Sequence, residues 1–179
     1  MRRALALAPF LLAAPSLGAP VAQPASPGPK PSPEQVRVRE RMVILDVRTL
    51  VMAAKGYAAA NRSFVDELRC LGRPEECIPD YPKDAPAFVD PTYDFLRTWL
   101  GYDRKFHPGP RPSETEIQAA RASPTSLRSF AYTAVPERPG ETGFRAFCGD
   151  STGRMCFTPN GTEPEVTEGR CAKSCRELK

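Results

Sequence analysis

Asp150 and Ser151 stand in a Gly-Asp-Ser-Thr-Gly run, and a serine in such a run could act as an acylating nucleophile. That chemistry needs a histidine base within hydrogen-bond reach and an acid that orients the histidine. The sole histidine of the chain is His107, which lies in a proline-rich stretch and is expected to be a surface loop residue. A tight turn explains the same run, because Asp150 can bond its own backbone and Gly153 can take a left-handed conformation. We therefore predict a turn here and no catalytic residues.

The six cysteines are the second group of residues that could carry chemistry. An even number of cysteines in an exported chain favours disulfides over free thiols. Cys70 and Cys77 bracket a short loop, CLGRPEEC, and are predicted to pair. Closing a loop of this length is expected to stabilise the fold by about 2–3 kcal/mol.

Two pairings are open for the remaining cysteines, which are Cys148, Cys156, Cys171 and Cys175. If the predicted turn closes a hairpin, Cys148 and Cys156 lie opposite each other and can pair, and the two tail cysteines then pair locally. In the other arrangement each hairpin cysteine takes one tail cysteine. This second arrangement is favoured, because it explains why a tail without predicted structure carries two cysteines. A zinc site is not expected, because the four lack close-spaced C-x-x-C pairs.

Charge and motif content argue against several classes of function. The formal net charge of +4 falls to +2 without Arg2 and Arg3, and the charges are mixed along the chain. Nucleic-acid binding usually needs a basic stripe, so it is not expected. The chain has no phosphate-binding loop, no dinucleotide glycine pattern and no histidines at metal-ligand spacing. We therefore predict no cofactor and no bound metal.

The N-terminal part has the composition of an export signal followed by a linker. Residues 1–19 combine two arginines, a short apolar run and small residues, which is typical of a secretory signal peptide. Residues 20–33 are proline-rich and are expected to be an extended leader. An uncleaved anchor is the alternative, although two prolines interrupt the apolar run. A periplasmic or extracellular location, without a membrane span after cleavage, is the expectation.

The helices and strands that would position these residues are expected in a folded domain over residues 34–160. A cysteine-containing tail over 161–179 follows it. Ser32 and Gln35 make a capping box before apolar residues at spacings of seven, four and three, which predicts a long helix. The fold class is α+β, a long N-terminal helix packed on a small antiparallel sheet, with proline-rich loops. The predicted helices are Glu34–Ala60, Ser63–Leu71, Thr92–Leu100 and Glu114–Ala122, and the predicted strands are Gly101–Phe106, Leu127–Val135, Phe144–Cys148 and Met155–Phe157.

Two stretches carry a family resemblance. TAVPERPGETGFRAFCGDSTG, at 133–153, resembles the C-terminal sheet of bacterial type IV pilin-like and type II secretion pseudopilin-like proteins. RTLVMAAKGYAAANRSFVDELRCL, at 48–71, is similar to the soluble half of the long first helix in that family, with the turn and short helix after it. The resemblance covers roughly residues 34–160. Pilins begin with an unbroken apolar helix, whereas this sequence has a signal peptide and leader there, so the resemblance implies a soluble head.

That resemblance implies a non-enzymatic domain that acts by contact with an envelope or secreted protein. If the first helical turns overhang the sheet, Val36, Met42 and Val43 become an exposed apolar patch, which usually marks a contact site. The alternatives are a secreted disulfide-stabilised binding or inhibitor module and, with less support, a small secreted hydrolase. The sequence does not identify the partner.

The signal-peptide prediction gives a first test. We expect export with cleavage between about Ser16 and Ala22, because small residues cluster there after the apolar run. N-terminal sequencing of the exported protein checks this, and material that still begins at Met1 would contradict it.

Overall fold

The computed structural model describes residues 30–178, so the predicted signal peptide and most of the leader lie outside the described residues. The helices are α1 (Pro33–Asn61), α2 (Arg69–Gly72), a 3-10 turn η1 (Pro74–Glu76) and α3 (Glu114–Ala120). The strands are β1 (Thr98–Trp99), β2 (Tyr102–Pro108), β3 (Phe130–Pro136), β4 (Ala146–Asp150), β5 (Met155–Thr158), β6 (Val166–Thr167), β7 (Arg170–Cys171) and β8 (Arg176–Glu177).

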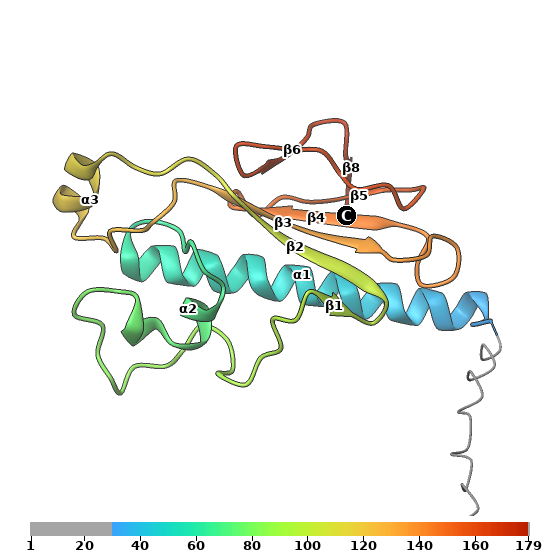
Figure 1. Cartoon of the computed structure of the whole chain (residues 1–179), viewed down its shortest axis with the longest axis horizontal. Coiled ribbons are helices and arrows are strands. Elements are labelled where there is room, and N and C mark those ends of the chain that lie inside the picture. The colour runs from blue at the N-terminus through green and yellow to red at the C-terminus, as the bar shows by residue number, and fades with distance from the viewer. Residues whose placement is uncertain (1–29, 179) are drawn as a thin grey trace, which may run out of the picture.

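Helix α1 lies along one face of a six-stranded antiparallel sheet (Figure 1). The strand order is β1-β2-β3-β4-β5-β8, and β6 pairs with β7 in a separate ladder. The predicted α+β class, with a long helix and an antiparallel sheet, is confirmed.

Helix α1 begins as its sequence predicts. The Ser32 backbone N–H donates to Gln35 Oε1 at 2.7 Å, and the Gln35 N–H donates to Ser32 Oγ at 3.2 Å. This capping box satisfies two backbone donors that a helix start leaves unpaired. Pro33 fits the first helical position because its ring pre-sets the helical φ angle. The helix ends where Arg62 takes a left-handed conformation with φ of 59°.

The hairpin of β4 and β5 turns at the predicted Asp150–Gly153 run. The Gly153 N–H donates to the Asp150 carbonyl at 2.8 Å, and Gly153 has φ of 89°, which favours glycine. The Asp150 carboxylate accepts the Thr152 N–H at 2.9 Å, as expected of an Asp at a turn start. In this register Cys148 lies opposite Cys156. The turn prediction is confirmed.

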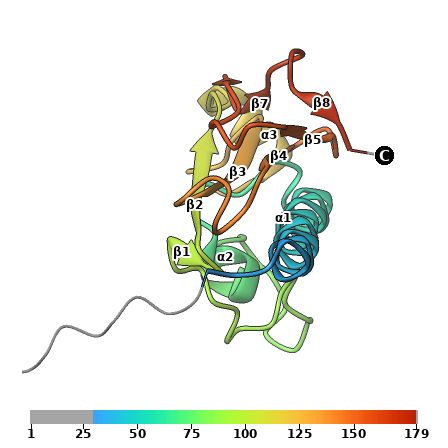
Figure 2. The ribbon, with the colours of Figure 1, turned by 90° about the vertical axis from the view of Figure 1, so that its right-hand side faces the viewer.

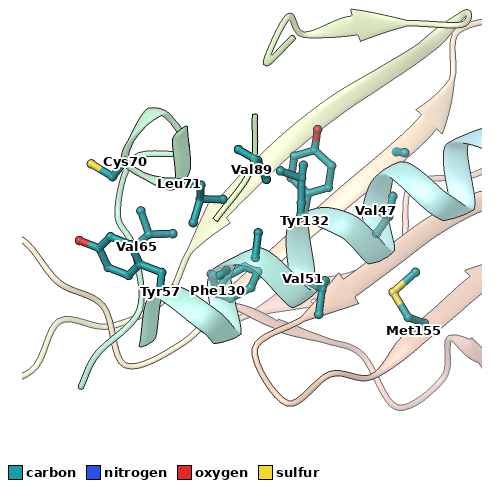
Figure 3. Packing of buried hydrophobic residues seen from close by; sticks show 14 of the residues in the cluster. Val47, Val51, Tyr57, Val65, Cys70, Leu71, Val89, Phe130, Tyr132 and Met155 are labelled. Carbon is teal, nitrogen blue, oxygen red and sulfur yellow. The ribbon is translucent and has the colours of Figure 1, made fainter. Parts of the chain in front are cut away.

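The core lies between α1, the inner face of the sheet and the segment around α2 (Figure 3). Gly149 on β4 lets the helix come close, because a Cβ there would lie 2.7 Å from Val51 Cγ2 and 3.0 Å from Val47 Cγ1. The buried side chains that meet in this layer include Val43, Val47, Leu50, Val51, Ala54 and Tyr57 of α1, and Phe130, Tyr132, Ala134, Phe147 and Met155 of the sheet.

Two predicted helices are wrong for reasons that lie in tertiary contacts. The segment Thr92–Leu100 is a loop ending in β1, because the carbonyls of Asp94 and Leu96 accept from the buried Arg104 guanidinium instead of from a helix. The predicted helix from Ser63 is α-helical only over α2, because Phe64 pairs with Leu127 in a β-bridge.

The three disulfides confirm one prediction and decide the open one. Cys70 pairs with Cys77, as predicted. Cys148 pairs with Cys171 and Cys156 with Cys175, so the tail is linked to the sheet and the local pairing is wrong. Cys148 and Cys156 are neighbours on the face of the sheet opposite α1, and this side-by-side position lets two tail cysteines reach them. Three disulfides indicate an oxidising compartment, such as the periplasm or the extracellular space.

The tail is not the structureless loop that its sequence predicts. It forms β6, β7 and β8, and β8 extends the main sheet beside β5. The Arg154 guanidinium donates to the carbonyls of Cys171 and Ala172 at 3.0 and 2.9 Å and to that of Cys175 at 2.8 Å. These bonds hold the tail where its cysteines meet the hairpin. Within residues 30–178, none of the helices combines the length and the apolar composition needed to cross a bilayer.

The tail disulfides yield the second prediction. Cys148→Ala combined with Cys171→Ala should lower the free energy of unfolding by about 2–4 kcal/mol, because the cross-link no longer restricts the unfolded chain. Urea denaturation of oxidised protein measures this change. Non-reducing peptide mapping is the control on the native chain and should link Cys156 to Cys175. A peptide joining Cys148 to Cys156 would contradict the arrangement.

Candidate functional site

The predicted contact patch at the start of α1 is only partly exposed. Val36 and Val43 are 1% and 0% exposed, so the prediction that they form a surface is wrong. Met42 is 45% exposed. The loop between β3 and β4 lies against the first turns of α1, so these turns do not overhang an uncovered edge.

Glu40 is the residue of α1 that holds this loop. Its buried carboxylate accepts the backbone N–H groups of Phe144 and Arg145 at 2.8 and 2.9 Å. The Arg145 guanidinium donates to the second carboxylate oxygen from Nε at 3.0 Å and from Nη2 at 2.8 Å. Four bonds to one buried carboxylate fix the loop against the first turns of α1.

Asp46 supplies a second buried anchor on the same helix. Its two carboxylate oxygens accept from Arg104 Nη1 at 3.2 and 3.4 Å, and both side chains are almost fully buried. The Tyr93 hydroxyl also donates to Asp46. Burial and the adjacent Asp46 carboxylate raise the pKa of Tyr93 above its ordinary value. Glu40 and Asp46 together fix the rotation of α1 about its own axis.

With that rotation, a second apolar stripe of α1 faces outward. Val38, Met42, Leu45 and Met52 are 47%, 45%, 59% and 60% exposed. Their spacings are four, three and seven residues, which places them on one line along a helix. Thr49 fills the gap in this line. Figure 2, which views the molecule nearly along α1, shows that the sheet and the segment around α2 leave part of the helix surface uncovered.

A row of basic residues runs along one flank of this outward stripe. Arg37, Arg41, Arg48 and Lys55 are exposed and follow each other at spacings of four, seven and seven residues. Within residues 30–178, none of these four side chains has a carboxylate within ion-pair distance. The outward stripe and its basic row therefore form one surface, apolar in the middle and positive on one side.

The far end of the outward stripe lies in a shallow groove of about 490 Å³. Phe88, from the loop after α2, forms the other wall. Gly56 lets that ring approach, because a Cβ at this position would lie 3.0 Å from Phe88 Cδ1. The residues that line the groove are Leu45, Arg48, Thr49, Met52, Ala53, Gly56 and Phe88.

The residues that could have formed a serine nucleophile do not meet. Ser151 Oγ is buried and has no hydrogen-bond partner in the described part of the chain. The Asp150 carboxylate is occupied by Thr152 and by the Cys171 backbone N–H at 3.1 Å. These contacts give Asp150 a role in holding the turn and the tail.

His107 lies on β2 rather than in the predicted surface loop. Its Nε2 is 2.8 Å from Thr133 Oγ1 and 3.7 Å from Glu163, so it faces neither Asp150 nor Ser151. Burial, and then the neighbouring Lys105, lower the pKa of His107 below its ordinary value. The neutral imidazole is therefore favoured on this strand.

A second hollow, of about 650 Å³, lies along β2 and has a polar wall. Its charges are paired with one another. Arg97 Nε is 2.7 Å from Asp103 Oδ1, and Lys105 Nζ is 3.7 Å from Glu163 Oε1. Paired charges leave little net potential for a charged ligand, in contrast to the basic row on α1.

Sequence reasoning found Met42 but missed the rest of the outward stripe. The signal was present, since Val38, Met42, Leu45 and Met52 have helical spacing in the sequence alone. It was missed because one apolar stripe was enough to explain a helix on a sheet. The sequence of α1 carries two such stripes, and periodicity cannot say which one is buried.

No family model, curated protein or solved structure matches this chain. The pilin-like resemblance therefore remains a prediction, and the surface on α1 has to be interpreted from its own chemistry.

Neighbouring residues of α1 provide the third prediction. Val43→Asp should lower the free energy of unfolding by about 3–5 kcal/mol, because it leaves an unpaired charge in the core. Met42→Asp should change it by no more than about 0.5 kcal/mol, because that position is exposed. Urea denaturation followed by circular dichroism compares the two variants. Equal losses in both would contradict the assignment of the buried and outward faces.

Proposed function

We propose that this chain is an exported, non-enzymatic domain, similar to a pilin-like head, that acts by binding another envelope or secreted protein. The observation that carries the proposal is the outward stripe of Val38, Met42, Leu45 and Met52 on α1. An exposed apolar row beside unpaired charges is the kind of surface that proteins use for partner contact.

The export part of the proposal is supported by the three disulfides and by the predicted signal peptide. Disulfides persist outside the reducing cytosol. The pilin-like part is supported by the arrangement of a long helix on an antiparallel sheet with a cross-linked C-terminal region. Fold alone does not define a function, so the contact surface is the part of the proposal to test.

Site-specific cross-linking in the producing cell gives the fourth prediction. A photo-cross-linking amino acid at position 45 should yield one discrete adduct with a partner protein, because this side chain points away from the core. Met52→Asp in the same chain should abolish the adduct, because a charge in the outward stripe opposes apolar contact. Gel electrophoresis and mass spectrometry of the adduct provide the measurement.

The matched control is the cross-linker at position 96. Leu96 is 67% exposed, comparable to Leu45 at 59%, but lies in the loop before β1. Position 96 should give no adduct with the same partner. An absence of adducts at position 45, or an adduct that persists with Met52→Asp, would reject the outward stripe as the contact surface.

A further inference from the structure

The width of the outward stripe limits what can cover it. Its members alternate at spacings of four and three residues, with Thr49 at the position between Leu45 and Met52. This spacing puts two residues of every seven on one narrow line, the seam along which two helices pack in a coiled coil. A seam of this width is typical of contact with one other helix, whereas a helix that lies on a membrane presents a wider apolar face. The members of the outward stripe are aliphatic or thioether side chains, without the Trp or Phe that membrane-surface helices favour.

The length of the outward stripe also fits a single helix. From Val38 to Met52 it spans about 21 Å at 1.5 Å per residue, which is two heptads. The groove beside Phe88 continues the seam past Met52 to Gly56. A straight apolar helix of similar length could therefore pack along this side of α1 with its side chains between those of the stripe.

Charge selects among the helices that could occupy the seam. Arg41, Arg48 and Lys55 recur every seven residues, so they keep the same position beside the seam through two heptads. In coiled coils the residues at such flanking positions determine partner choice. A second copy of this chain would bring a second basic row to the same contact, whereas a helix with Asp or Glu on its flank would neutralise the row.

We infer that the partner presents an amphipathic helix with apolar residues at heptad spacing and an acidic flank, and that this helix packs along α1 from Val38 to Met52. This inference rests on the proposed function, and it adds the chemistry of the partner. The acidic flank lies against Arg41, Arg48 and Lys55, and the apolar side chains cover Met42, Leu45 and Met52.

The probe is a fluorescent synthetic peptide of three heptads with Leu at the two seam positions and Glu at both flanking positions. Its twin carries Lys instead of Glu. Titration of full-length oxidised protein by fluorescence anisotropy should show the Glu peptide binding at least about tenfold more tightly than the Lys twin. The preference should shrink as salt is raised, because exposed charges are screened.

Two sets of variants test the surface itself. Leu45→Ser combined with Met52→Ser should abolish binding of the Glu peptide. Arg41→Glu combined with Arg48→Glu should reverse the preference, so that the Lys twin binds more tightly. The matched controls, Leu96→Ser and Lys83→Glu combined with Arg111→Glu, change exposed residues elsewhere and should leave both affinities unchanged.

Several outcomes would overturn the inference. These are equal binding of the two peptides, binding of neither, or a preference that the Arg41→Glu and Arg48→Glu changes leave intact. Binding to phosphatidylglycerol vesicles that the Leu45→Ser and Met52→Ser changes abolish, without peptide binding, would assign the surface to a membrane. Dimerisation in analytical ultracentrifugation that Met52→Asp abolishes would assign it to a second copy of the chain.

Failure of this inference can be told apart from failure of the proposed function. If the adduct at position 45 forms and is unchanged by Arg41→Glu and Arg48→Glu, the outward stripe binds a protein but the acidic helix is wrong. If no adduct forms at position 45, the proposed function is wrong and the inference is rejected with it.

Discussion

The two buried carboxylates of α1 are the constraint on which the rest of the arrangement depends. Glu40 accepts four hydrogen bonds from Phe144 and Arg145, and Asp46 accepts from Arg104 and Tyr93. An unpaired buried charge costs about 3–5 kcal/mol. A shift of α1 by one residue would turn these side chains by about 100° and break both sets of bonds. Buried ion pairs often add little net stability, whereas a rotated α1 would leave both carboxylates without these partners.

That orientation decides which side of α1 meets solvent. The helix is apolar on two sides, with Val43, Val47 and Leu50 on one and Val38, Leu45 and Met52 on the other. Either side could have formed the core by hydrophobicity alone. The acids are on the Val43 side, where the guanidinium groups of Arg104 and Arg145 are available, and the second apolar side is left at the surface.

The face of the sheet opposite α1 is covered by the C-terminal tail. There the tail contributes Cys171 and Cys175 to disulfides with the β4–β5 hairpin, and Arg154 holds the tail carbonyls in place. Asp150 stabilises both the turn and the tail, because its carboxylate accepts hydrogen bonds from the Thr152 N–H within the turn and from the Cys171 backbone N–H in the tail. The tail cysteines are buried beside Ala131 on this face, so disulfides and hydrophobic burial both hold the tail there. Asp150, which belongs to the run that resembled a nucleophile motif, thus helps to join the tail to the sheet.

The sequence by itself determined the features that depend on neighbouring residues. The capping box at Ser32, the turn at Asp150–Gly153 and the Cys70–Cys77 loop were all predictable, because each involves groups within seven residues of one another. Only the tertiary structure decided that the first turns of α1 are covered while a second apolar stripe faces outward, and which tail cysteine pairs with Cys148 and which with Cys156. Glu40 and Arg145 are 105 residues apart, and Asp46 and Arg104 are 58 apart, so no local pattern records these contacts. Helical periodicity marks an apolar line on a helix, but the buried polar partners of the helix determine whether that line faces the core or the solvent.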